Sequence, residues 1–146
     1  MPAPFIFYEG EDILKENIFK VAFSFTTTTA VSLLGGWDTA LQTLVVIVVL
    51  DYATGLLRAA YHNKLNSKVG LKGIIKKFMY FAVVALASLI DGAAGTNNHL
   101  IRDAIIFFFI ANEGLSILEN YTDCGLPMVP KLREMLEQLK GEGNTK

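Results

Sequence analysis

Two acidic side chains lie inside long apolar stretches of this sequence, where a charge is costly. Asp51 follows the nearly aliphatic run 41–50, and Glu113 follows the apolar run 105–110. A carboxylate near the centre of an apolar helix costs about 2.5–3.5 kcal/mol on insertion scales, so each acid needs a partner, a proton or water. A carboxylate pair can perform acid–base catalysis, but no base, nucleophile or metal ligand adjoins these two. We therefore predict no catalytic site.

Residue types that hold metals and cofactors are sparse. The chain has one cysteine, Cys124, and two histidines, His62 and His99. These allow neither an intramolecular disulfide nor zinc-ligand spacing. The sequence contains no glycine-rich phosphate loop and no nucleophile elbow, and a net charge of −1 supplies no basic field for nucleic acid. We predict no metal, no cofactor and no nucleic-acid partner.

The polar residues of the apolar stretches follow helical spacing. One stripe runs from Asp51 at intervals of three, four and seven residues, and a second contains Asn112, with Glu113 beside it. Such stripes suit a buried polar network between helices, or the wall of a water-filled lesion formed by assembled subunits, and the residues allow both. The candidate pore or helix-contact residues are Asp51, Thr54, Gly55, Arg58, Asn112, Glu113, Ser116 and Glu119.

Composition and block length indicate how these residues are positioned. Hydrophobic residues make up 52% of the 146 positions and charged residues 18%, against roughly 25% charge in soluble domains. The apolar blocks approach the length of about 20 residues that crosses a bilayer. We predict an all-α polytopic membrane protein, with three clear transmembrane helices at about 37–61, 76–95 and 100–121 in a membrane domain, 35–121. Asp38 is expected to cap the first of these helices.

The two ends of the chain are expected to differ from this membrane domain. The N-terminal segment, 1–34, predicts an amphipathic or weakly transmembrane helix, a possible fourth span that ends before Gly35-Gly36. The C-terminal segment, 122–146, predicts a tail with a short amphipathic helix that opens at Pro130. A turn at 96–98 is expected to supply an Asn cap to the helix that follows it.

Basic residues predict the orientation in the membrane. Residues 58–77 contain Arg58, Lys64, Lys68, Lys72, Lys76 and Lys77 and no acid. The positive-inside rule therefore places the expected connection, 62–77, in the cytoplasm, and the C-terminal tail falls on the same side. We predict a multi-pass protein of the bacterial cytoplasmic membrane with a cytoplasmic C-terminus.

Four blocks of sequence resemble the toxin-secretion and phage-lysis holins, small holins of Gram-positive phages and clostridia. The blocks are LDYATGL at 50–56, SKVGLKG at 67–73, NEGLSILEN at 112–120 and CGLPMVPKL at 124–132. The resemblance implies a phage-type holin that oligomerises in the host membrane and opens non-specific lesions. Through these lesions an endolysin or a toxin is released, and the host cell lyses.

The resemblance also implies the partners, namely membrane lipids, further copies of the chain and a cooperating endolysin, and it assigns no catalytic residue. Two alternatives stay open at this stage. One is an antiholin that regulates a pore former, and the other is a small channel or transporter subunit.

Overall fold

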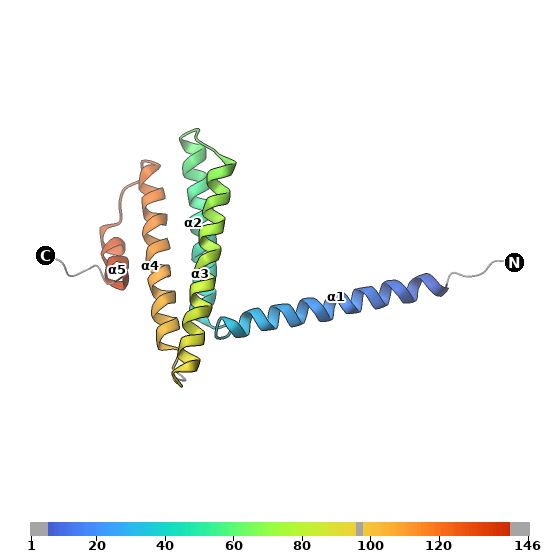
Figure 1. Ribbon diagram of the computed structural model, residues 1–146. Helices are drawn as coiled ribbons and strands as arrows, with labels where there is room; N and C mark the ends of the chain where they lie inside the picture. The colour runs from blue at the N-terminus through green and yellow to red at the C-terminus, as the bar shows by residue number, and fades with distance from the viewer. Residues whose placement is uncertain (1–5, 96–97, 141–146) are drawn as a thin grey trace.

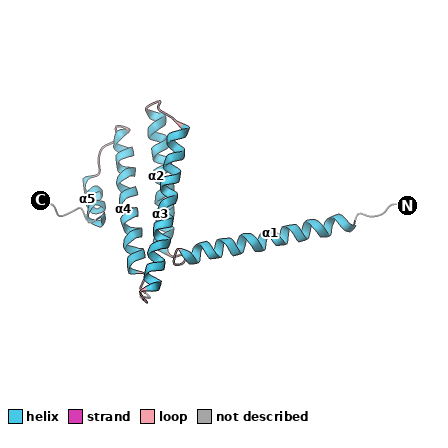
Figure 2. Ribbon diagram, viewed as in Figure 1, coloured by secondary structure: helices cyan, strands magenta, loops and turns pink. Residues whose placement is uncertain are grey.

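The protein folds as a set of helices (Figure 2). The computed structural model describes residues 6–95 and 98–140, and every regular element in these ranges is helical, as the all-α prediction required. The helices are α1 (Ile6–Leu33), α2 (Thr39–Tyr61), α3 (Ser67–Ala93), α4 (Leu100–Asp123) and α5 (Pro130–Lys140). The start of the predicted N-terminal segment, two residues of the predicted turn at 96–98 and the end of the predicted tail lie outside the described residues.

Helices α2, α3 and α4 form a bundle, from which α1 projects sideways (Figure 1). Along α2 the buried residues Leu41, Leu44, Val48 and Asp51 recur at intervals of three and four, the period that keeps one helix face against its neighbours. The three apolar residues of this set pack in a core cluster whose other members are Val84, Ile106, Phe109 and Ile110. Helix α4 therefore lies in the middle of the bundle and contributes most of its buried side chains.

The predicted number of clear transmembrane helices was wrong. Among the described residues, only α2 and α3 are long and apolar enough to cross a membrane. Helix α4 has sufficient length, but its 24 residues include Arg102, Asp103, Glu113, Glu119 and Asp123. Helix α1, the possible fourth span, is likewise diluted by charges in its first half and by threonines in its second.

Helix α3 begins well before the position predicted for it. The basic segment 62–77 was expected to be a connection, but only residues 62–66 separate α2 from α3. The side chain of Asn66 caps the start of α3 by accepting a hydrogen bond of 2.9 Å from the Lys68 backbone N–H. Lysines are good helix formers when they point to solvent, so the basic residues did not mark a loop.

The starts of α2 and α4 are capped by acids. Asp38 accepts from the Leu41 N–H at 2.9 Å and so caps α2, as predicted. The start of α4 is capped differently from the prediction, because its N-cap residue, His99, makes no side-chain cap bond. The buried carboxylate of Asp91 instead accepts from the N–H groups of Ile101 and Arg102, at 3.2 and 2.9 Å.

Helix α5 packs against α4 on the outside of the bundle (Figure 1). Its Leu136 side chain lies over Gly114, where an added Cβ would come within 3.0 Å of two Leu136 carbons. The short C-terminal helix was predicted, and the glycine is what lets it approach so closely.

Candidate functional site

A layer of charge crosses the middle of the bundle. The Lys77 ammonium of α3 lies 2.6 Å from a carboxylate oxygen of Asp51 on α2, and it also pairs with Glu113 of α4. Asp51 and Glu113 retain only 7% and 4% of their exposure. One cation therefore joins three helices by facing two buried carboxylates. We name Asp51, Lys77 and Glu113 the charged layer.

Neutral polar groups complete the charged layer. The Asn120 amide donates to Asp51 at 3.3 Å and to the Thr54 hydroxyl at 3.2 Å, and that hydroxyl donates to the Asp51 carbonyl at 3.0 Å. Tyr80, one turn after Lys77, stacks on Phe109 with ring centroids 4.2 Å apart. No buried side-chain nitrogen or oxygen of the described residues lacks a hydrogen-bond partner. The layer is thus fully satisfied while the bundle is closed.

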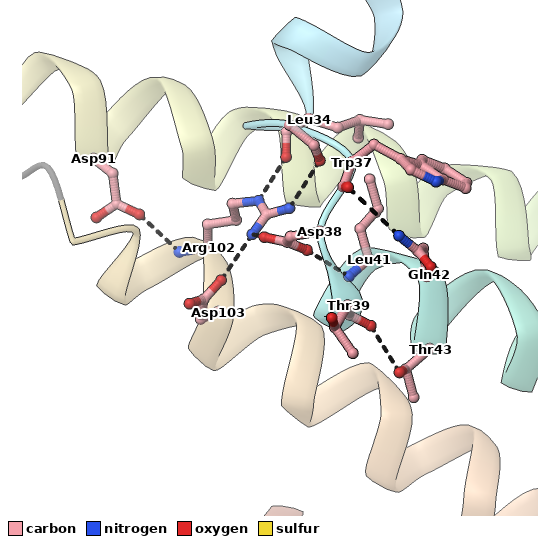
Figure 3. Close-up of polar contacts among 11 residues, drawn as sticks. Leu34, Trp37, Asp38, Thr39, Leu41, Gln42, Thr43, Asp91, Arg102 and Asp103 are labelled. Carbon is pink, nitrogen blue, oxygen red and sulfur yellow. Dashed lines mark hydrogen bonds and ion pairs between the residues drawn. The ribbon is translucent and has the colours of Figure 1, made fainter.

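A second charged cluster lies at the end of the bundle where the α1–α2 connection meets the start of α4 (Figure 3). The side chain of Arg102 is completely buried. Its guanidinium donates to the Leu34 carbonyl at 2.6 Å, to Asp38 at 2.6 Å and to Asp103 at 2.8 Å, and makes a longer bond of 3.3 Å to the Gly36 carbonyl. The connection between α1 and α2 is therefore held against the start of α4.

The geometry around Arg102 constrains its neighbours. Gly35 has a φ of +82°, and a Cβ there would lie 2.7–2.8 Å from Arg102 and Ser88, so the position needs glycine both for its backbone conformation and for space. The hydrogen bond from Arg102 lowers the pKa of the Asp38 carboxyl below its ordinary value. Asp38 consequently stays ionised at neutral pH while it caps α2 and holds the guanidinium.

The end of the bundle beyond the charged layer carries a more open cluster. Arg58 of α2 pairs with Asp123 at 3.2 Å, and a ring nitrogen of His62 lies 3.1 Å from the Asp123 carbonyl. Both side chains of the pair are about half exposed. This pair lies where solvent screens it, so it contributes little to stability.

The predicted site residues separate into two groups. Asp51, Thr54 and Glu113 meet in or beside the charged layer, Gly55 lies next to Asn120, and Arg58 joins the Asp123 pair. The other three are not brought into the layer by any hydrogen bond or ion pair recorded for the described residues. They are Asn112, which is partly buried, Ser116, which is also partly buried, and Glu119, which is exposed.

Sequence reasoning missed two residues that organise these clusters, Lys77 and Arg102. Lys77 was counted with the basic connection, but it continues the inward face of α3. That face repeats at intervals of three and four through Gly70, Gly73, Lys77, Tyr80, Val84, Ala87 and Asp91. The periodicity was the signal that could have found it.

A family model and a named relative indicate the same family for this chain. A sequence profile of the bacteriophage holin family matches residues 28–141. A probable holin of Bacillus phage phi105 is 30% identical over 106 residues, which cover 73% of this chain and 78% of that protein. An uncharacterised protein of Clostridium perfringens is 36% identical over 127 residues, covering 87% and 94%. An uncharacterised protein of Listeria monocytogenes is 43% identical over 104 residues, covering 71% and 74%. No solved structure matches the chain significantly.

Proposed function

Because the chain belongs to the bacteriophage holin family, we propose that it oligomerises in the cytoplasmic membrane of a bacterial host and opens non-specific lesions there. The lesions release an endolysin or a toxin, and lysis of the host follows. The chain performs no catalysis in this process. The observation that best supports the proposal is the charged layer, which joins α4 to two helices, α2 and α3, that are long and apolar enough to cross a membrane.

The charged layer gives the closed bundle a means of becoming a lesion. While α2, α3 and α4 are packed together, the positive charge of Lys77 is paired with the carboxylates of Asp51 and Glu113. The closed bundle can then lie in lipid without exposing these charges to it. Separation of α3 from the other two helices would leave Asp51, Lys77 and Glu113 without their ion-pair partners in hydrocarbon, at a cost of several kcal/mol. Hydration of these charges by water, or contact with the polar surface of another subunit, removes that cost. Opened bundles are therefore stabilised when several of them assemble around a water-filled channel.

The same contacts support a multi-pass topology. We place α4 across the membrane beside α2 and α3, because its two buried charged residues, Arg102 and Glu113, are paired inside the bundle and not exposed to lipid. Residues 62–66 and the C-terminal tail then lie in the cytoplasm, and the Arg102 cluster lies at the outer face. Helix α1 leaves the bundle sideways at that outer end (Figure 1), an orientation that suits a helix lying along the membrane surface.

The topology predicts the outcome of reporter fusions at Asn66. A cytoplasm-only reporter joined there is expected to be active and a periplasm-only reporter silent, because six basic residues and no acid lie between positions 58 and 77. Fusions at Asn98 in the opposite turn provide the control, and we expect the reverse pattern. Periplasmic activity from the Asn66 fusion alone would overturn the topology.

Inducible expression in a bacterium tests the proposed function. We expect abrupt loss of membrane potential whenever the chain accumulates, and lysis only when an endolysin is produced in the same cells. Endolysin alone and the chain alone are the controls. Two results would contradict the proposal. Delay of lysis caused by another holin, with no loss of potential from this chain alone, would make it an antiholin, and an ion-selective current without endolysin release would make it a channel.

A further inference from the structure

A groove opens between α2 and α3 on the side of the charged layer away from the apolar core, and Ser116, Asn120 and Asp123 of α4 also line it. Its volume is about 730 Å³. Leu56, Ala59, Leu65 and Val69 give it apolar walls, and Gly55, Gly70 and Gly73 line it without side chains. Arg58, His62, Lys64 and the acidic Asp123 lie at its polar end. We name this space the α2–α3 groove.

The dimensions of the groove match one leaflet of a bilayer. Asp51, at its deep end, and His62, near its mouth, are eleven residues apart on α2 and the turn that follows. At about 1.5 Å per residue that separation is roughly 17 Å. The hydrocarbon core of a bilayer is about 30 Å thick, so one leaflet contributes about half of that. The basic mouth therefore falls at headgroup level when the deep end lies near the bilayer centre.

The mouth of the groove carries positive charge that the bundle does not neutralise. Arg58 is paired with Asp123, and Lys77 with the two acids of the charged layer. Within the described part of the chain, no ion pair is recorded for Lys64. The nearby Lys68, Lys72 and Lys76 are exposed on α3. The groove thus combines an apolar slot with an anion-attracting end.

We propose that the α2–α3 groove binds one anionic phospholipid of the cytoplasmic leaflet. The phosphate lies against Lys64, Arg58 and His62, and an acyl chain lies along Leu56 and Val69 in the space that the glycines leave open. Charge complementarity favours a lipid over a second copy of this chain, because a neighbouring copy in the same leaflet would bring its own basic segment to the same level. The site rests on the proposed topology and goes beyond the proposed lytic activity.

A steric variant tests the apolar part of the site. Gly73 lines the groove, and a Cβ added there meets no atom within 4 Å, so the side chain of Gly73→Leu starts in open space, occupies part of the slot and leaves the charge unchanged. The substitution also raises helix propensity, which protects the fold. Gly92→Leu is the matched control, because Gly92 is also in α3 with open space around it but lies far from the groove.

A charge variant tests the mouth of the site. Lys64→Gln removes a cation that lines the groove and has no ion pair recorded among the described residues, whereas Lys68→Gln removes an identical charge four residues away that does not line it. Each basic residue near a membrane surface contributes enough for about a fivefold change in binding of an anionic lipid. If the lipid were held only by general attraction to basic residues, the two substitutions would weaken its binding equally. If it binds in the groove, Lys64→Gln should weaken binding more than Lys68→Gln.

Native mass spectrometry of the full chain, released from detergent with equimolar phosphatidylglycerol and phosphatidylcholine, measures the binding. We expect one retained phosphatidylglycerol in the wild type, in Gly92→Leu and in Lys68→Gln. We expect its loss in Gly73→Leu and about fivefold weaker retention in Lys64→Gln. Inorganic phosphate and glycerophosphoglycerol, added separately as competitors without acyl chains, should displace the lipid poorly.

Three results would overturn the site. The first is equal loss in the two lysine variants, the second is full retention in Gly73→Leu, and the third is complete displacement by either competitor. A change of oligomer size in Gly73→Leu with unchanged lipid retention would assign the groove to a second copy and would also overturn it. The assay requires no lysis, so its failure is distinguishable from failure of the proposed function.

Discussion

Replacement of Arg102 by Met is expected to destabilise the bundle by about 2–6 kcal/mol, about 1–3 kcal/mol for each of two carbonyls left without a donor, and to prevent accumulation of the protein. Methionine fills much of the volume of the side chain, but it donates no hydrogen bond. Two backbone carbonyls, of Leu34 and Gly36, lose the donor that the guanidinium supplies. Asp38 and Asp103 retain 47% and 40% of their exposure and stay solvated, so the lost bonds and the unsatisfied carbonyls account for most of the cost.

Thermal unfolding in detergent and the steady-state amount in membranes measure this effect. Arg58→Met is the matched control, since it makes the same replacement at an arginine whose side chain is 45% exposed and whose partner, Asp123, is 55% exposed. An exposed pair contributes about 1 kcal/mol or less. If the two variants unfolded at the same temperature, Arg102 would not pin the α1–α2 connection to α4 in the way the structure indicates.

The helices were predictable where apolar sequence and capping signals coincide. The segment predicted at 37–61 differs from α2 only by two residues at its start. The agreement is close because Asp38 caps the helix and the long aliphatic run that follows favours no other structure. The segment predicted from position 76 missed about two and a half turns at the start of α3. Glycine and lysine between 67 and 77 suggested a connection, but Gly70 and Gly73 lie on the inward face of the helix and Lys68, Lys72 and Lys76 point to solvent. Local composition outweighed periodicity in that prediction.

The acids of the charged layer could be found from sequence, and their partners could not. Asp51 and Glu113 are identifiable because a carboxylate in an apolar run must be explained. Lys77 lies 36 positions from Glu113, and Arg102 lies 64 positions from Asp38. Which cation meets which acid depends on how three helices are packed, and a single sequence does not contain that distance information. The predicted number of clear spans failed for a different reason, since the charged residues that make α4 less apolar than α2 and α3 are visible in its own sequence.

Replacement of Lys77 by Met is expected to be nearly as damaging as loss of Arg102. It leaves Asp51 and Glu113 buried together without a cation, and breaking a buried ion pair in this way costs about 3–5 kcal/mol. The triple variant Lys77→Met, Asp51→Asn, Glu113→Gln removes all three charges and should accumulate as well as wild type. If the triple variant were as poorly folded as Lys77→Met alone, the ion pairs would not be the cause of the loss.

The neutral triple variant then separates folding from opening. If the charged layer must be hydrated when α3 separates from α2 and α4, a bundle without these charges should accumulate and oligomerise but fail to permeabilise cells. Asp51→Asn alone is the milder test, because the Lys77–Glu113 pair remains and the amide can still bond Asn120. We expect both variants to show reduced dye uptake at matched protein amounts, with the larger reduction in the triple variant. Wild-type uptake by both would leave the charged layer a packing and hydrogen-bonding device that takes no part in opening the membrane.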